Sequence, residues 1–197
     1  MELPPREISS GFAEIIKYAV LGAPKITECI SKENTLSSSL LAWYVEQSLK
    51  QKERFVKNDI SESANRLFLN FGHTIGHAIE FSTIYDGEET LRHGQGVALG
   101  MIAIFRICIE LDYLEESDIK WLRAVLDRFE LPIYYESMAI GLKPEELVKN
   151  ILNLAFKDKK RTNTGLRLIL LDGIGNPFIF KTNSQKLIKL GIEEVIK

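Results

Sequence analysis

The sequence predicts a mainly α-helical bundle with a small β-hairpin or strand pair near the C-terminus. Apolar residues recur every three or four positions through most of the chain, as they do along the buried faces of helices. Only beyond Lys160 do two short apolar runs flank a glycine-containing turn, a pattern typical of paired strands. With 197 residues, 45% of them hydrophobic, residues 1–197 are expected to form a single domain.

The individual elements follow from the apolar spacing and from the residues at their ends. Helices are expected over residues 12–21, 36–57, 65–82, 94–112, 116–129, 144–156 and 184–195. The segment 94–112 is apolar on nearly all sides, so it should form the centre of the bundle. Pro144 suits the first turn of its helix. Strands are expected at 166–171 and 177–180.

Composition excludes several classes of protein. The formal net charge of −2 argues against a general nucleic-acid binder, which normally carries a basic face. The chain has neither an apolar run of bilayer length nor a secretory signal peptide, so we expect a cytoplasmic protein without a membrane partner. Cys29 and Cys108 lie in apolar helical surroundings and should behave as small hydrophobic residues without a disulfide.

The glycines of residues 94–100 superficially resemble a dinucleotide-binding loop. Such a loop must follow an apolar strand and open a helix, yet residues 87–92 are polar and have no strand pattern. We therefore expect these glycines to permit close helix packing around His93.

All three histidines, His73, His77 and His93, are adjacent to a glycine within one short stretch. His73 and His77 are four residues apart, which places them on one face of a helix. Neutral imidazole is a common metal ligand, so the cluster predicts a metal or anion site, with a carboxylate supplied from elsewhere. The alternative is that the histidines are ordinary core or surface residues.

Several charged residues extend this hypothesis. Glu14 and Lys17 are three apart on a helix otherwise suited to burial, where a carboxylate needs a cation or a metal; the alternative is an ion pair at the helix rim. Arg66 and Asn70 are one turn apart on the helix expected to carry the first two histidines, and they suit carboxylate or phosphate oxygens. The basic run 157–161 adds a weak indication of an anion site.

Four separated segments resemble the C-terminal domain of 3-dehydroquinate synthase, and the resemblance covers essentially the whole chain. They occur in the family's order and are residues 10–18, 66–80, 93–101 and 158–160. The family's preceding nucleotide-binding domain, which holds most of the NAD site, is missing from this sequence. The resemblance therefore implies an N-terminal NAD-binding partner domain in cis or in trans, and we expect the isolated chain to be inactive and to self-associate.

The resemblance also implies a reaction and a metal. The family is a group of carbon–oxygen lyases of the shikimate pathway that convert a small phosphorylated sugar acid, 3-deoxy-arabino-heptulosonate 7-phosphate, to 3-dehydroquinate. NAD transiently oxidises a ring hydroxyl, phosphate is eliminated, the ketone is reduced, and the opened ring closes by an aldol step. Glu14, His73 and His93 would bind Zn²⁺ or Co²⁺, leaving open coordination positions for substrate oxygens.

The same motifs assign the remaining roles. The group expected to bind the phosphate, with Lys160 as the preferred contact, comprises Asn70, His77, Lys159 and Lys160. Arg66 and Lys52 would bind the carboxylate and neighbouring hydroxyls, and Lys17 and Glu62 would complete the catalytic polar network with Lys52. The substrate's own phosphate can serve as the base for the elimination, so no dedicated base is required.

The sequence departs from the family at two positions. Gln95 and Ala64 replace residues that are usually Glu and Gly in the family, and Gln95 is expected to weaken metal binding at His93.

Three other functions compete with the assignment to this family. The first is a related sugar-phosphate cyclase, which would act on a substrate without a carboxylate, whereas Arg66 and Asn70 favour the dehydroquinate reaction. The second competing function is a non-catalytic helical interaction domain. The third is a relative of the iron-dependent glycerol-type dehydrogenases, which needs no such phosphate-binding group.

Overall fold

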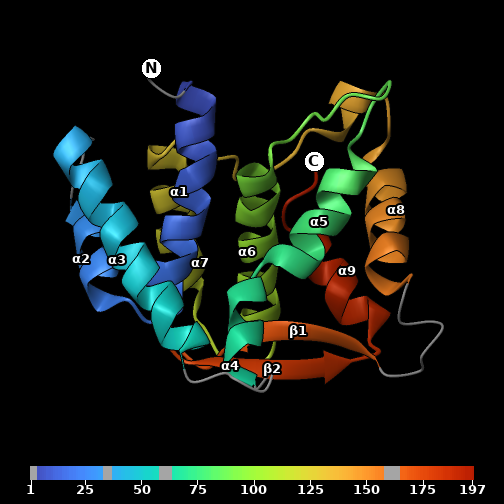
Figure 1. The fold of residues 1–197 in the computed structure, drawn as a ribbon. Coiled ribbons are helices and arrows are strands. Elements are labelled where there is room, and N and C mark those ends of the chain that lie inside the picture. Colours follow the sequence, from blue (N-terminus) through green and yellow to red (C-terminus); the bar gives the residue numbers. More distant parts are fainter. Residues whose placement is uncertain (1–3, 33–36, 58–63, 158–164) are drawn as a thin grey trace.

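The computed structural model describes residues 4–32, 37–57, 64–157 and 165–197. Its centre is α6 (His93–Glu110), which stands between α1 (Pro5–Val20) and α5 (His73–Ser82) in Figure 1. Most side chains of α6 between Gly94 and Cys108 are buried. This confirms the central position predicted for the apolar helix.

The other helices surround α6 in two groups (Figure 1). These helices are α2 (Pro24–Lys32), α3 (Ser38–Val56), α7 (Glu116–Arg128), α8 (Pro144–Phe156) and α9 (Gln185–Glu193). The first group places α2 and α3 against α1, with α7 against α6, and the second places α8 against α5, with α9 against α6. A short 3₁₀ helix, η2 (Ser137–Ile140), precedes α8. Within the part of the chain that the structure describes, every helix is too short or too polar to cross a membrane.

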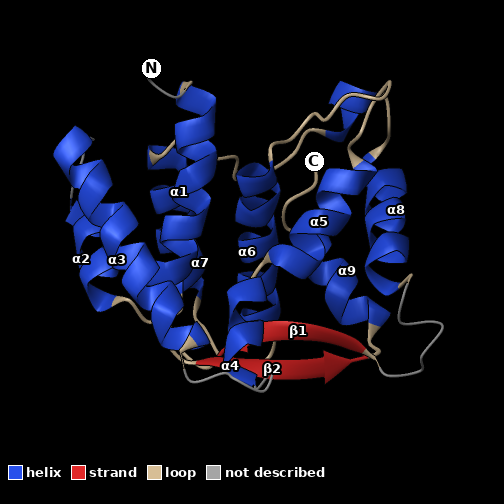
Figure 2. Ribbon diagram, viewed as in Figure 1, coloured by secondary structure: helices blue, strands red, loops and turns tan. Residues whose placement is uncertain are grey.

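One antiparallel hairpin closes an end of the bundle (Figure 2). It consists of β1 (Leu166–Leu171) and β2 (Pro177–Thr182), in a register that pairs Ile169 with Ile179. All side chains of β1 except Arg167 are buried, and the strand packs against α6. The hairpin and the helices together confirm the predicted fold class.

Helix starts follow local chemistry. Ser37 Oγ accepts a hydrogen bond from the Leu40 amide at 3.1 Å, and Ser184 Oγ accepts one from the Leu187 amide at 3.3 Å. Such side chains satisfy amides that have no partner within the first helical turn. Helix α1 starts at Pro5, seven residues earlier than expected, because Pro at the first position of a helix loses no intrahelical hydrogen bond.

The single helix predicted over residues 65–82 is wrong. The chain instead forms α4 (Ala64–Leu67) and the 3₁₀ helix η1 (Phe68–Asn70), and then turns at Phe71 and Gly72 before α5. Gly72 has φ +76°, a left-handed conformation that strains other residues. Arg66 and Asn70 therefore do not lie on the same helix as the histidines, contrary to the prediction.

Glycines bring α5 and α6 unusually close together. A Cβ atom added at Gly100 would lie 2.1 Å from the Gly72 carbonyl oxygen, and one at Gly76 would lie 2.8 Å from the Gly96 carbonyl oxygen. At the start of α6, the Gly94 amide donates a hydrogen bond to Ser10 Oγ of α1 at 3.0 Å. These contacts confirm that the glycines around His93 permit close packing, and they seat the start of α6 between α1 and α5.

Candidate metal and anion site

Three chain segments place potential metal ligands together. Glu14 comes from the middle of α1, His73 is the first residue of α5, and His93 is the first residue of α6. Their ligand atoms all lie within 4.8 Å of one another. The turn at Gly72 directs the start of α5 toward α1, and the contact of Gly94 with Ser10 brings the start of α6 to the same place.

The two carboxylate oxygens of Glu14 have different environments. Oε2 accepts a hydrogen bond from Lys17 Nζ at 2.6 Å, and Lys17 also donates to the Leu69 carbonyl oxygen at 2.8 Å. Oε1 lies 3.4 Å from His73 Nε2 and is buried without a hydrogen-bond partner among the described residues. A buried oxygen normally has a partner, so an unpartnered one facing an imidazole nitrogen suits a metal ligand.

The hydrogen bonds of the two imidazole rings leave Nε2 available on each. His73 Nδ1 lies 3.0 Å from the Phe71 carbonyl oxygen, and His93 Nδ1 lies 3.1 Å from Glu80 Oε1. Since both partners are acceptors, we assign the ring protons to Nδ1. The other nitrogen of each ring then carries a lone pair, which is the form that binds metals.

Electrostatics and geometry agree with this assignment. Burial lowers the pKa of His73, and the Lys17 ammonium lowers it further, which favours the neutral ring. Burial also lowers the pKa of Lys17, while the Glu14 carboxylate opposes that shift. Two ligands about 2.0–2.2 Å from a tetrahedral ion lie roughly 3.3–3.6 Å apart. The 3.4 Å separation of Glu14 Oε1 and His73 Nε2 fits such a pair.

Glu80 is a site residue that the sequence analysis missed. It lies on α5, three residues after His77 and seven after His73, so helical spacing alone places it on the histidine face. Burial raises the pKa of its carboxyl group, and His93 and His77 oppose that shift. His77, Glu80 and His93 form a second group whose ligand atoms lie within 4.8 Å of one another.

A cavity of about 620 Å³ lies next to the histidines, between α5, α8 and β1. Its polar lining residues are Asn70, Thr74, His77, Lys157 and Arg167. Asn70 and His77 belong to the predicted phosphate-binding group, whereas Lys159 and Lys160 lie outside the described residues. Arg167 was missed, although an isolated arginine in an otherwise apolar strand is a detectable signal.

The remaining predicted site residues are dispersed. Lys52 is exposed on α3 and lines a separate groove of about 400 Å³ that also includes Glu14. Arg66 is exposed on α4 and is not part of the lining of either cavity. Glu62 lies outside the described residues. The structure thus brings together the three expected ligands and two of the expected anion contacts.

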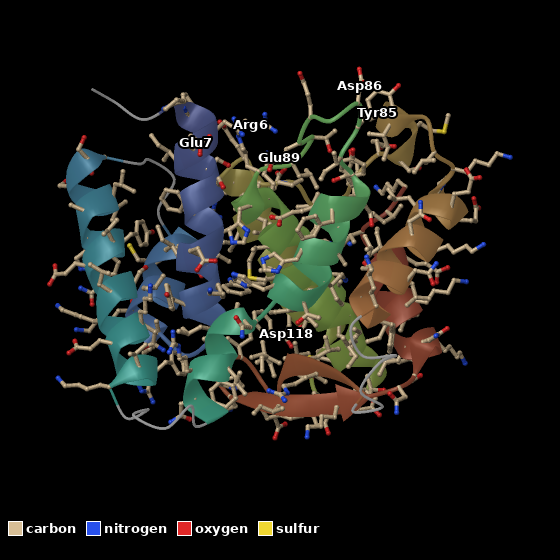
Figure 3. The ribbon with its side chains drawn as sticks, turned by 45° about the vertical axis from the view of Figure 1, so that its right-hand side comes forward. Arg6, Glu7, Tyr85, Asp86, Glu89 and Asp118 are labelled. Carbon is tan, nitrogen blue, oxygen red and sulfur yellow. The ribbon has the colours of Figure 1, made fainter. Side chains whose placement is uncertain are left out.

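Gln95 has a structural role at the start of α6. Its Oε1 atom accepts hydrogen bonds from the Arg92 amide at 2.9 Å and from the Arg6 guanidinium at 3.2 Å. Arg6 also donates to the Thr90 carbonyl oxygen at 3.0 Å, so the start of α1 is tied to the loop before α6. Figure 3 labels Arg6 at the start of α1 and Glu89 in that loop. The carboxylate next to His93 comes from Glu80.

Comparisons with known proteins indicate the family of the chain. The family model described as 3-dehydroquinate synthase C-terminal matches residues 11–161. The chain is 35% identical over 194 residues to a 3-dehydroquinate synthase of Acinetobacter baylyi, covering 96% of this chain and 51% of that protein. It is 37% identical over 179 residues to one of Xanthomonas oryzae, covering 88% of this chain and 46% of that protein. The chain therefore spans about half the length of these relatives.

Solved structures share the fold. A 2-deoxy-scyllo-inosose synthase complexed with carbaglucose-6-phosphate, NAD⁺ and Co²⁺ matches with a TM-score of 0.73 at 23% identity, covering 98% of this chain and 53% of that one. A 2-epi-5-epi-valiolone synthase from Streptomyces hygroscopicus, with NAD⁺ and Zn²⁺ bound, matches with a TM-score of 0.71 at 17% identity. The match covers 96% of this chain and 51% of that one. With the family match over most of its length, the chain belongs to the 3-dehydroquinate synthase family and corresponds to its C-terminal domain.

Proposed function

We propose that this chain is the metal- and substrate-binding half of a 3-dehydroquinate synthase. The observation that carries the proposal is the convergence of Glu14, His73 and His93 beside a cavity lined by Asn70 and His77. The substrate would be 3-deoxy-arabino-heptulosonate 7-phosphate, which is cyclised to 3-dehydroquinate with loss of phosphate. The cavity would bind the phosphate of this substrate. The ligand cluster, which consists of Glu14, His73 and His93, would hold the metal that binds its ring oxygens.

The ligand cluster would hold Zn²⁺ or Co²⁺. When bound, the metal would polarise substrate hydroxyl and carbonyl oxygens, and NAD would accept and return a hydride. Lys17 restrains Glu14 through the 2.6 Å contact, which keeps Oε1 toward His73. Lys52 lines the groove of about 400 Å³ that also includes Glu14, and it would bind substrate oxygens. We retain Arg66 as the proposed contact of the substrate carboxylate and Glu62 as a member of the polar network.

The phosphate group would bind in the 620 Å³ cavity. Asn70 and His77 offer hydrogen-bond donors there, and Lys157 and Arg167 add two positive charges. Charged donors form the stronger hydrogen bonds to phosphate. Lys159 and Lys160 remain proposed contacts from the adjacent segment.

A nucleotide-binding domain, in cis or in trans, is part of this proposal. The strands among the described residues form one antiparallel hairpin, whereas a dinucleotide fold needs parallel strands joined through a helix. The relatives named above are about twice as long as this chain, which is consistent with such a domain. We propose that NAD is bound mainly by that domain.

The proposal is tested by complementation. The chain, with Zn²⁺ or Co²⁺ and NAD, is assayed for phosphate release from 3-deoxy-arabino-heptulosonate 7-phosphate, alone and mixed with the N-terminal half of a related 3-dehydroquinate synthase. We expect activity only in the mixture, and loss of that activity with Glu14→Gln. Activity of the chain alone would contradict the need for a partner domain. Turnover only of sugar phosphates without a carboxylate would contradict the substrate assignment.

We also propose that the chain forms a homo-oligomer. Helix α3 exposes Val45 and Leu49 beside the groove that contains Glu14. Adjacent exposed apolar side chains favour association. Sedimentation velocity over a range of concentrations should show a concentration-dependent shift above the mass of 22.4 kDa. A constant monomer mass would contradict this part of the proposal.

A further inference from the structure

We propose that Glu80 is a positioning residue that orients the His93 ring for metal binding. The inference rests on the proposed metal site formed by Glu14, His73 and His93. It assigns a role to a residue that is neither a proposed ligand nor a proposed substrate contact.

The first observation is the contact between the two side chains. Glu80 Oε1 lies 3.1 Å from His93 Nδ1. The His93 side chain is 54% exposed at the first position of α6, so packing alone does not restrain its ring. The Glu80 side chain is only 19% exposed, so its carboxylate is held by packing and can restrain the more exposed ring. The hydrogen bond holds the proton on Nδ1 and leaves Nε2 for the metal.

The second observation is that the Glu80 side chain occupies the space left by the missing Cβ of Gly96 on α6. A Cβ atom added at Gly96 would lie 2.4 Å from Glu80 Cγ and 2.8 Å from Glu80 Oε1. The three atoms nearest that position all belong to Glu80. A side chain at position 96 would thus push the carboxylate away from His93, while its main collision would be with a flexible side chain.

The third observation separates positioning from direct ligation. Glu80 is also grouped with His77 and His93, so a second metal ion bound by these three is the competing possibility. In the structure the Glu80 oxygen lies at hydrogen-bond distance, 3.1 Å, from His93 Nδ1, so this nitrogen carries the ring proton and has no lone pair for a metal ion. Glu80 therefore acts through His93 in this arrangement.

The experiment compares metal affinity among variants of the full chain. Co²⁺ is titrated by absorption spectroscopy, and Zn²⁺ affinity is measured by competition with a chelator. The variants are Glu80→Ala, Glu80→Gln, Gly96→Ala and the double variant Glu80→Ala/Gly96→Ala. Glu89→Ala is the matched control, because it removes an exposed carboxylate from the loop before α6, where Figure 3 labels it. Circular dichroism verifies that each variant is folded.

We expect Glu80→Ala to weaken Zn²⁺ binding about 10–100-fold, the usual effect of losing the hydrogen-bond partner of a ligating histidine. Glu80→Gln should restore part of the affinity, since its amide oxygen still accepts from Nδ1–H. Gly96→Ala should weaken binding in the wild-type background but have no further effect when residue 80 is alanine. Long-range ¹⁵N spectra of the metal-free chain should show that His93 loses its preference for the Nδ1–H tautomer in Glu80→Ala.

Three results would overturn the proposal, and they are distinguishable. Unchanged affinity in Glu80→Ala would mean that the contact does not orient His93. A stoichiometry of two metal ions per wild-type chain, reduced to one in Glu80→Ala, would make Glu80 a ligand. If the wild-type chain bound no Co²⁺ or Zn²⁺, the proposal of a metal site would be contradicted, and so would the proposed role of Glu80.

Discussion

Lys17 Nζ lies 2.6 Å from Glu14 Oε2, and the other oxygen of that carboxylate faces His73. The Lys17 side chain is only 3% exposed. A buried ammonium needs an anion nearby, because the interior solvates charge poorly. The same pair therefore neutralises a charge inside the bundle and restrains the carboxylate of the candidate metal site.

Glu14→Gln is expected to abolish most metal binding while preserving the fold. The amide keeps the side-chain volume and an acceptor for Lys17, but it removes the anionic ligand. The affinity for Zn²⁺ should fall by more than the roughly 10–100-fold that accompanies loss of an outer hydrogen-bond partner. Glu7→Gln, also on α1 but paired with Arg92, is the control and should bind normally. Equal affinities in the two variants would exclude Glu14 as a ligand.

Arg167→Ala should weaken binding of inorganic phosphate to the cavity of about 620 Å³. Arg167 is exposed, so the loss should be about 1.4- to fivefold, consistent with ~0.2–1 kcal/mol for an exposed charge pair. Calorimetric titration measures the effect, which should diminish in high salt. Lys149→Ala, which removes an exposed positive charge on α8 away from this lining, is the control. Equal losses in both variants would indicate only a general effect of net charge.

Gly100→Ala and Gly11→Ala should change stability in opposite directions. A Cβ at Gly100 would lie 2.1 Å from the Gly72 carbonyl oxygen, so α5 and α6 must separate, at a cost of about 1–3 kcal/mol or more. A Cβ at Gly11 meets nothing within 4 Å. Because Gly11 lies inside α1, alanine there should add about 0.5–1 kcal/mol. Urea denaturation measures both, and an unchanged midpoint for Gly100→Ala would contradict the close contact.

The two cysteines should differ in reactivity. Cys108 is buried, and burial raises the pKa of its thiol to about 12, so the reactive thiolate is scarce near pH 8. Cys29 is partly exposed on α2. Ellman's reagent should therefore modify one thiol per native chain and two in urea. Rapid modification of both in the native chain would show that the packing of α6 against β1 opens readily.

The sequence by itself determined most of the helices, the hairpin and the histidine cluster, although it did not predict α2. These features depend on local patterns: the apolar surface of α6, the paired apolar runs of β1 and β2, and the spacing of His73 and His77. Such features are encoded within a few turns of one element, so a single segment is sufficient to predict them. Local patterns left two interpretations of Glu14, a carboxylate compensated by a metal or an ion pair with Lys17, and its place among the ligands came from the resemblance to the family.

Only the tertiary structure decided how α5 and α6 meet. The chain breaks at Gly72 between η1 and α5. Glu80 of α5 contacts His93 of α6, and Arg167 of β1 lines the cavity with His77 of α5. Each of these features depends on how different elements meet. Helical spacing shows which residues share a face, but it does not determine the distance or angle between two helices. Here the backbone contacts at Gly76 and Gly100 set that geometry, because only residues without a Cβ allow two helices to approach so closely.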